Sequence, residues 1–514
     1  MHMTLERVLG VQLILLVVLL SNNACGDPLV VSTANGAVRG EYLSQGNSSC
    51  RVWYGIPYSV PPVGPRRWLP ATSPAPWSGI RDATNPAPGC PQRCSLPPGH
   101  CPPATSEDCL YLNVFAPLTD SSSLKSSSLS PVMVFIHGGN FLEGMGTDSF
   151  YDGTTLVNRT GDLLLVTVNY RLGALGFFFQ PQASSAHALR SSEISTSTLT
   201  VPNLGLLDQK LALQWVQENI EDFGGDPTRV TLFGQSAGAT SVAAHLQNGH
   251  SPPLFQRAIL QSVPLGIPLR EPDEAEKINE LFAAALDCSS GNLTCLQAAS
   301  VEAVLTAQSK AGSSLSPDWG HLLEIAQSWQ PVIRMGPFLL PKQPAEFLPG
   351  YTGAPLMLGV TSQEVYLFVW AAYNKSMSVL EAGALEAVLF GLEPLSKMNS
   401  FYPLHLTGDN RSPVSDMGTD ELFVCPARNV SLGIAAAGNW DSYYYVFDHV
   451  PTDAAHGWGP DYEVCYTHVC HGTELAFVFN SAQAAELTET PQEQALSDSM
   501  QVWVSGATVQ QCVP

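Results

Sequence analysis

The chain alternates between short apolar runs of strand length and longer segments with helical periodicity. Residues 131–136 read Pro-Val-Met-Val-Phe-Ile and lead into a Gly-Gly pair, and residues 163–168 form another apolar run. Continuous apolar runs of this length are typical of strands buried on both faces of a parallel sheet. Between 206 and 220 the apolar residues recur at helical spacing, and the Gly-Gly-Asp-Pro stretch 224–227 ends the pattern. We therefore predict two buried parallel strands and then a helix.

A further strand and helix follow directly. Residues 230–233 (Val-Thr-Leu-Phe) predict a short strand and residues 237–246 a helix, with Ser236 at the turn between them. The Ser-rich stretch 120–130 and the polar stretch 183–200 are typical of exposed loops. Because there is no internal repeat and no convincing interdomain linker, the alternation favours one large α/β domain.

The composition is that of a large globular chain. It has 514 residues, of which 45% are apolar, and this rules out a disordered chain. Its 23 basic and 45 acidic side chains give a formal net charge of −22. A surface of this sign repels phosphate backbones, so we expect no nucleic-acid partner.

The N-terminus has the features of a secretory signal peptide over residues 1–24. Arg7 supplies the positive charge, residues 8–20 are apolar with few interruptions, and small or polar residues follow at 21–24. The apolar run is short for a membrane span of about 20 residues, although an uncleaved anchor is the other interpretation. No later segment reaches that length without charges or breakers. We expect a mature chain that is secreted, with no membrane span.

Sequons and cysteines agree with an extracellular location. Six Asn-X-Ser/Thr sequons occur, at Asn47, Asn158, Asn292, Asn374, Asn410 and Asn429. Many of the twelve cysteines fall in closely spaced sets. In an oxidising compartment such sets favour disulfides over metal binding.

A serine motif lies at the predicted strand–helix turn. Residues 234–238 read Gly-Gln-Ser-Ala-Gly. A serine between a strand and a helix sits on so sharp a turn that only small residues fit two positions before and after it. Its hydroxyl is then exposed at the carboxyl edge of the sheet, near a helix N-terminus. The flanking elements favour Ser236 as a nucleophile.

Two other stretches fit the same chemistry. His137-Gly138-Gly139-Asn140 follows a predicted strand, and its successive N–H groups suit an oxyanion hole, although an ordinary Gly-Gly turn explains it equally well. A serine nucleophile also needs a base and an orienting acid, in the chain order nucleophile, acid, histidine. His471 lies late enough in the chain, but the residues alone select neither it among twelve histidines nor one acid.

The chain resembles the type-B carboxylesterase and cholinesterase family from about residue 30 to about residue 504. The motifs that carry the resemblance are 54–58 (Tyr-Gly-Ile-Pro-Tyr), 106–114 (Ser-Glu-Asp-Cys-Leu-Tyr-Leu-Asn-Val), 169–173 (Asn-Tyr-Arg-Leu-Gly), 203–209 (Asn-Leu-Gly-Leu-Leu-Asp-Gln) and 233–239 (Phe-Gly-Gln-Ser-Ala-Gly-Ala). The resemblance implies an α/β-hydrolase fold, with a central, mostly parallel sheet and helices on both faces. It implies a single hydrolase domain over residues 25–514.

Residue roles follow from the same resemblance. It implies a triad of Ser236, Glu364 and His471, and oxyanion donors at the N–H groups of Gly139, Asn140 and Ala237. It also implies a buried ion pair between Arg171 and Asp208. For disulfides, Cys90 pairs with Cys109 and Cys288 with Cys295 by family position. We further expect Cys94 with Cys101 and Cys425 with Cys512, and leave Cys25, Cys50, Cys465 and Cys470 as candidates for pairing.

Some positions depart from the family pattern. Gln235 stands where the family usually has Glu, which removes a negative charge beside the site. Asn140 replaces a third glycine, and Asn accepts positive φ better than most residues. Val365 replaces the glycine after the acid, which bears on the local backbone. Residues 505–514 are unlike the family, whose members continue with a further strand and helices, so we expect a truncated C-terminus.

Substrate preference can be read only in part. Cholinesterases bind quaternary ammonium on a tryptophan face, in the disulfide loop that corresponds to residues 90–109, and this loop contains no aromatic residue. Leu269 stands where the family often has another Trp, and Trp329 is the one ring left in the acyl-pocket stretch 326–331. We therefore expect an apolar acyl pocket rather than a choline-ester site.

These features predict a secreted serine carboxylesterase that acts on small-molecule esters without metal or cofactor. A lipase working at lipid interfaces is one alternative, although the polar loop 91–103 offers no obvious apolar lid. A non-catalytic adhesion protein is another, disfavoured because the Ser, Glu and His are all present. A zinc site at Cys465, His468, Cys470 and His471 fits no common ligand spacing and would consume the general base.

Overall fold

The computed structural model describes residues 27–97, 99–118, 129–179, 200–315, 327–390, 395–438, 441–453 and 456–509. The predicted signal peptide and most of the predicted loops 120–130 and 183–200 lie outside the described residues.

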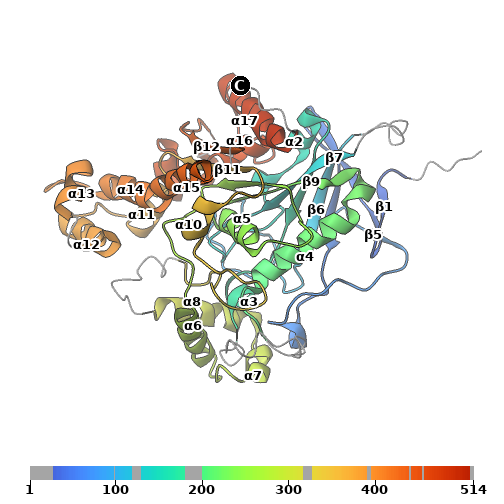
Figure 1. The fold of residues 1–514 in the computed structure, drawn as a ribbon, viewed down its shortest axis with the longest axis horizontal. Helices are drawn as coiled ribbons and strands as arrows, with labels where there is room; N and C mark the ends of the chain where they lie inside the picture. Colours follow the sequence, from blue (N-terminus) through green and yellow to red (C-terminus); the bar gives the residue numbers. More distant parts are fainter. Residues whose placement is uncertain are drawn as a thin grey trace, which may run out of the picture.

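The described chain runs through strands and helices in alternation (Figure 1). The strands are β1 (Val30–Thr33), β2 (Gly36–Arg39), β3 (Glu41–Gln45), β4 (Ser48–Pro57), β5 (Ile80–Asp82), β6 (Tyr111–Pro117), β7 (Ser130–Ile136), β8 (Leu164–Val168), β9 (Gly225–Gln235), β10 (Arg257–Gln261), β11 (Leu356–Thr361) and β12 (Ser442–Phe447). The α-helices are α2 (Thr154–Thr160), α3 (Gly173–Phe177), α4 (Leu204–Asn219), α5 (Ala237–Asn248), α6 (Pro272–Ala285), α7 (Leu293–Ala298), α8 (Val301–Ser313), α10 (Pro344–Phe347), α11 (Tyr366–Ala372), α12 (Val379–Phe390), α13 (Leu395–Phe401), α14 (Arg411–Thr419), α15 (Cys425–Ala436), α16 (Leu475–Phe479) and α17 (Pro491–Val509). Shorter helical turns are η1 (Gly64–Arg66), η2 (Ser149–Tyr151), η4 (Ile220–Phe223), η5 (Leu348–Gly350), η6 (Asp420–Val424), η7 (His456–Trp458) and η8 (Pro460–Tyr466).

A mixed sheet forms the centre of the molecule. In the described residues it has nine strands in the order β12-β11-β10-β9-β7-β8-β6-β4-β3. Neighbouring strands from β12 to β8 are parallel, and those from β8 to β3 are antiparallel. The sheet is therefore mostly parallel, as the resemblance implied. The small sheet β1-β2-β5 lies outside it.

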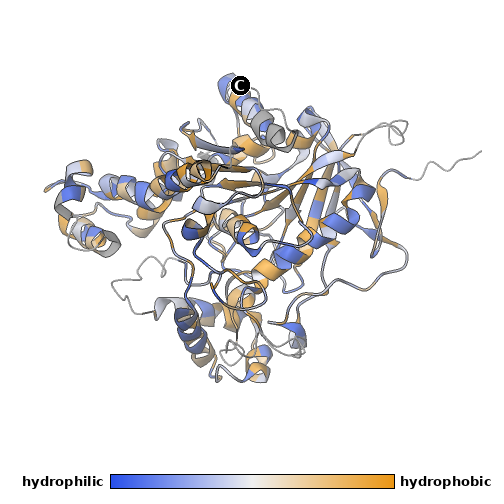
Figure 2. Ribbon diagram, viewed as in Figure 1, coloured by the Kyte–Doolittle hydropathy of each residue, from blue (hydrophilic) through white to orange (hydrophobic). Residues whose placement is uncertain are grey.

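Helices cover both faces of the sheet because its strands are apolar on both sides. Along β7, Val132, Val134 and Ile136 belong to one buried cluster, which includes residues of α4 and α5. Met133 and Phe135 belong to the other, with residues of α2, α16 and α17. Figure 1 shows α4 and α5 on one side of the strands and α2, α16 and α17 on the other, and in Figure 2 orange gathers along the central strands. This is the α/β-hydrolase arrangement, built as a single domain.

The elements predicted from periodicity are confirmed. The two apolar runs are β7 and β8, and they pair in parallel. The predicted helices correspond to α4 and α5, and the strand between them is β9, which begins at Gly225 rather than at residue 230. After α4 the chain continues through the short turn η4, which ends at Gly224. The φ of Gly224 is 98°, a conformation that glycine adopts without strain. The antiparallel strands β3, β4 and β6 had no prediction of their own.

Four disulfides lie within the described residues. They join Cys90 to Cys109, Cys94 to Cys101, Cys288 to Cys295 and Cys465 to Cys470. Cys425 is exposed and has no disulfide partner among the described residues; its predicted partner Cys512 lies outside them, so the Cys425–Cys512 bridge stays a prediction. Cys50 is a free thiol buried under α2, and its candidate partner Cys25 also lies outside them.

None of the helices in the described ranges combines the length and the hydropathy that a membrane span requires.

Candidate active site

Ser236 occupies a sharp turn between β9 and α5. Its backbone has φ 58° and ψ −123°, which is strained for a residue with a side chain, and its N–H donates to the Gln261 carbonyl at 2.9 Å. The glycines beside it are required by space. A Cβ on Gly238 would lie 2.0 Å from the Ile136 carbonyl oxygen, and one on Gly234 would lie 2.5 Å from the carbonyl carbon of Gly238. The turn at Ser236 therefore requires glycine both two positions before and two positions after the serine.

The loop after β7 runs beside this turn. A Cβ on Gly138 would lie 3.1 Å from Ser236 Cβ, so the two segments touch. Gly139 and Asn140 both have positive φ, at 95° and 57°. Ala237, the first residue of α5, is fully buried, with its N–H at the helix N-terminus. The structure thus places the loop that contains Gly139 and Asn140 beside the turn that contains Ser236 and Ala237.

His137 fixes the start of that loop. Its ring stacks on Tyr170 with centroids 4.6 Å apart, and Tyr170 donates its hydroxyl to the His137 carbonyl at 2.9 Å. Burial lowers the pKa of His137 to about 4, so the ring is neutral at ordinary pH. A neutral buried histidine adds no charge to the loop after β7.

Glu364 and His471 meet although 107 residues separate them. His471 Nδ1 lies 2.5 Å from Glu364 Oε2, and the other carboxylate oxygen accepts from the Thr361 N–H at 2.8 Å. The Glu364 side chain is fully buried, and that of His471 is 9% exposed. Val365, where the family has glycine, has φ −92° and ψ −9°, so its backbone is unstrained.

The other ring nitrogen of His471 faces Gln235. Gln235 Nε2 lies 3.0 Å from His471 Nε2. Among the described residues, no hydrogen bond joins Ser236 Oγ to the imidazole. Phe368 from α11 and Phe423 from η6 pack on the ring, each with centroids 5.3 Å from it. The sequence placed Gln235 next to Ser236 but gave no sign of its contact with the histidine.

Glu474 is a second carboxyl group in this region that the sequence did not single out. It is 1% exposed and follows His471 by three residues, and neither carboxylate oxygen has a hydrogen-bond partner among the described residues. Burial raises the pKa of Glu474 to about 7, and the negative charge of Glu364 acts in the same direction. The sequence around Glu474 does not indicate this raised pKa, because the shift depends on burial of the carboxyl group in the folded chain.

A disulfide closes the loop just before His471. Cys465 and Cys470 are fully buried and bonded to each other, and Val469 donates its N–H to Gln363 Oε1 at 2.8 Å. The loop is thus tied to the residue preceding Glu364. Because both sulfurs are in the disulfide, they are not available to zinc, and the described residues contain no group of three or more potential metal ligands.

The loop closed by Cys90 and Cys109 is hydrogen-bonded to the segment after β7. Gln92 exchanges two hydrogen bonds with the Gly144 backbone, at 2.8 and 2.9 Å. His100 Nδ1 lies 2.8 Å from Asp148 Oδ1, and its ring stacks on Phe150. These contacts tie the loop to the segment that follows β7.

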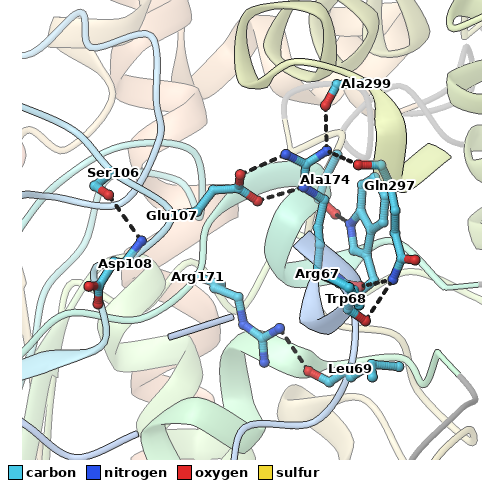
Figure 3. A network of polar contacts seen from close by, with 11 residues as sticks. Arg67, Trp68, Leu69, Ser106, Glu107, Asp108, Arg171, Ala174, Gln297 and Ala299 are labelled. Atoms are coloured by element: carbon cyan, nitrogen blue, oxygen red, sulfur yellow. Dashed lines mark hydrogen bonds and ion pairs between the residues drawn. The ribbon is translucent and has the colours of Figure 1, made fainter. Parts of the chain in front are cut away.

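Buried ion pairs brace the neighbouring segments. The expected pair forms: Arg171 Nη2 lies 2.7 Å from Asp208 Oδ1, with side chains 4% and 0% exposed. Figure 3 shows a second network, in which Arg67 lies between Glu107 and the carbonyls of Gln297 and Ala299 while Arg171 reaches the Leu69 carbonyl. Glu107 lies in a recognised motif, but nothing local to it identifies its partner 40 residues earlier.

A cavity of about 320 Å³ lies beside the first turns of α5. Thr240, one helical turn after Ser236, lines it together with Val263, Ile267, Leu269 and Gln343. Val263 follows β10, whose carboxyl end adjoins that of β9. The wall is mainly apolar, and Leu269 in it stands where the family often has Trp.

Comparisons with known proteins identify the family to which the chain belongs. Residues 27–509 match the model of the carboxylesterase family. The crystal protein of Dictyostelium discoideum is 36% identical over 88% of this chain and 77% of its own length, and para-nitrobenzyl esterase of Bacillus subtilis (strain 168) is 35% identical over 89% and 84%. A solved structure of PNB esterase superposes with a TM-score of 0.74 at 32% identity, covering 94% of this chain and 90% of that one. The chain belongs to the carboxylesterase family of α/β-hydrolases and is a carboxylic ester hydrolase.

Proposed function

We propose that the chain hydrolyses small-molecule esters through a Ser236–His471–Glu364 triad. The contact between His471 and Glu364, 2.5 Å long and closed off from solvent on the Glu364 side, supports this proposal most directly. A hydroxyl has negligible nucleophilicity without a base, and an oriented imidazole is such a base.

The reaction has two steps. Ser236 Oγ attacks the ester carbonyl while its proton passes to His471 Nε2, and the N–H groups of Gly139, Asn140 and Ala237 stabilise the oxyanion. Glu364 holds the imidazole and stabilises the imidazolium. The alcohol leaves with a proton from His471, and water activated by the same histidine then releases the acid from the acyl-enzyme.

Kinetics of the purified full chain test the mechanism. With a short-chain aryl ester, we expect a burst of about one phenolate per chain whenever deacylation is slower than acylation. Ser236→Ala should lower kcat by about 1,000-fold or more with an unchanged melting temperature. A folded Ser236→Ala protein that retains wild-type turnover would rule out Ser236 as the nucleophile.

We further propose that the cavity beside α5 holds the acyl group. Its apolar wall suits an alkyl chain, and a volume of about 320 Å³ exceeds the need of an acetyl group. The Cys90–Cys109 loop, without an aromatic ring, offers no cation–π face, so choline esters should be poor substrates.

One observation favours the alternative of a lipase acting at an interface. Leu380, Phe401 and Leu406, on the α12–α14 lobe that projects from the body in Figure 1, are 82%, 69% and 87% exposed. Exposed apolar side chains of this size mark lipid or protein contacts when they gather on one region. A lipase would gain activity sharply as an ester passes its solubility limit, whereas the proposed esterase would saturate below that limit.

Secretion and glycosylation are also proposed. The signal-peptide pattern, the disulfides and the sequons support an extracellular location. The acceptor asparagines 47, 158, 292, 374 and 429 are exposed. Asn410 differs, because it is fully buried and its Nδ2 donates to the carbonyls of Met377 and His405. We expect glycans at the exposed sequons and none at Asn410, which peptide mapping of secreted protein can check.

A further inference from the structure

The contact between Gln235 and His471 fixes the roles of both partners. Gln235 is 4% exposed at the end of β9, and its Nε2 lies 3.0 Å from His471 Nε2. An amide nitrogen donates hydrogen bonds but does not accept them. The amide is therefore the donor, and His471 Nε2 is the acceptor and carries no proton.

Glu364 requires the same form of the ring. Its Oε2 lies 2.5 Å from His471 Nδ1, and a carboxylate there needs a proton on Nδ1. If the Gln235 amide were turned over, its oxygen would need a proton on Nε2. The lone pair of Nδ1 in a neutral ring would then face the carboxylate. With the amide oriented as the structure places it, Nε2 toward the ring, both neighbours favour the neutral ring with its proton on Nδ1.

The same nitrogen has another task in the proposed reaction. Nε2 has one lone pair, and it must receive the proton of Ser236 as the Oγ–carbonyl bond forms. It cannot hold the Gln235 N–H and that proton together. Among the described residues no hydrogen bond yet joins Ser236 Oγ to the ring, so Gln235 holds the position that Ser236 must take.

We propose that Gln235 is a positioning residue that caps the general base in the free enzyme. Its amide keeps His471 Nε2 unprotonated and yields that nitrogen to Ser236 when an ester binds. The inference rests on the proposed triad. It also distinguishes this chain from the usual family pattern, because a carboxylate at this position would favour the imidazolium more than the amide does.

The other groups around His471 would not obscure the effect of a substitution at Gln235 on the protonation of the ring. The titratable groups that face the ring are Glu364 and Glu474. Phe368 from α11 and Phe423 from η6 cover the ring without charge. A change at Gln235 therefore alters the protonation of His471 without removing either acid.

The test compares wild type with Gln235→Met, which keeps the bulk without a donor, and Gln235→Glu. Gln247→Met on α5 is the matched control, since it makes the same chemical change away from His471. The first readout is the pH midpoint of the acid limb of kcat/KM for a neutral aryl ester. The second is the pH dependence of the downfield proton resonance of the Nδ1–H to Glu364 hydrogen bond.

Loss of a donor to the neutral ring should move both midpoints up by about 0.5 to 1 pH unit in Gln235→Met, the equivalent of one net hydrogen bond. Gln235→Glu should move them up by more than about one unit, because the carboxylate favours the imidazolium. Gln247→Met should leave them in place. Midpoints equal to those of wild type in both Gln235 variants would overturn the proposal. The resonance titrates whether or not the protein hydrolyses esters, so failure of the esterase proposal is seen separately.

Discussion

The two halves of the proposed active site are held in place by different means. The nucleophile half, made by the ends of β7 and β9, is set by backbone contacts so close that Gly234 and Gly238 leave no room for a side chain. The acid–base half joins side chains from two distant segments through the contact of Glu364 and His471. A disulfide, Cys465–Cys470, and a buried carboxyl group, Glu474, lie beside it.

Because the two halves are held differently, they should respond to different substitutions. The nucleophile half is fixed by tight backbone packing. The substitutions most able to disturb it are therefore those that break the buried ion pairs of the surrounding segments. The acid–base half depends on ionisable and covalent groups, so it should respond to pH and to loss of the disulfide. Substitutions can therefore be chosen to separate the two.

The largest effect is expected from Asp208→Asn, which breaks a brace of the nucleophile half. Removing one charge of a buried pair leaves Arg171 unpaired and costs about 3 to 5 kcal/mol of unfolding free energy. Denaturant unfolding of the variant measures the loss. Glu302→Gln is the control, because the Arg93–Glu302 pair is exposed and should contribute under about 1 kcal/mol. Equal small losses in both variants would show that burial of the first pair is energetically unimportant.

Glu474→Gln should give the next largest effect, and only at the acid–base half. Since the folded protein raises the pKa of Glu474 from 4.5 to about 7, the folded state holds a proton that the unfolded state has lost between these values. Stability from this group therefore falls as pH rises from 4.5 to 7, by about 3 kcal/mol in all.

The glutamine cannot ionise, so the variant escapes this loss. Its melting temperature relative to wild type should increase between pH 4.5 and pH 8 and then level off. A difference that does not change with pH would mean that Glu474 ionises normally in the folded chain.

Replacing Cys465 and Cys470 together by Ala should cost about 2 kcal/mol of stability, from the entropy of a short loop. Because His471 directly follows Cys470, opening the loop should disturb the position of the imidazole, so kcat should fall while KM changes little. The matched double variant at Cys288 and Cys295 opens a similarly short loop elsewhere, between α6 and α7. It should lose similar stability and keep its kcat. If both double variants keep kcat, the disulfide beside His471 does not position the base.

Ile267→Trp should have the smallest effect, since it alters the cavity and neither half of the site. Ile267 is partly buried in the cavity wall, and a larger ring reduces the space for an acyl chain. One or two methylenes in an apolar pocket are worth about 1 to 3 kcal/mol. We expect kcat/KM for butyrate or hexanoate esters to fall about tenfold relative to acetate esters. An unchanged chain-length profile would place the acyl group elsewhere.

The two halves also differ in what the sequence could predict. The turn at Ser236 is local: an apolar strand, a Gly-X-Ser-X-Gly stretch and a helix are adjacent in the chain. Glu364 and His471 are not, and among many acids and histidines only the family resemblance selected them. The contact of Gln235 with the imidazole and the raised pKa of Glu474 depend on side-chain packing in the folded chain. Cysteine count and order do not fix connectivity, so the residues alone left the pairing of Cys465 with Cys470 open.

If the two halves act together at Ser236, that serine alone should react with an organophosphate, and covalent labelling measures this. The purified full chain would be titrated with a diethyl aryl phosphate, with residual ester hydrolysis and the mass of the peptide containing Ser236 followed in parallel. We expect one diethylphosphoryl group per chain, attached to Ser236, and activity that falls in proportion to labelling. Activity that persists with Ser236 fully labelled, or is lost with Ser236 unlabelled, would contradict it.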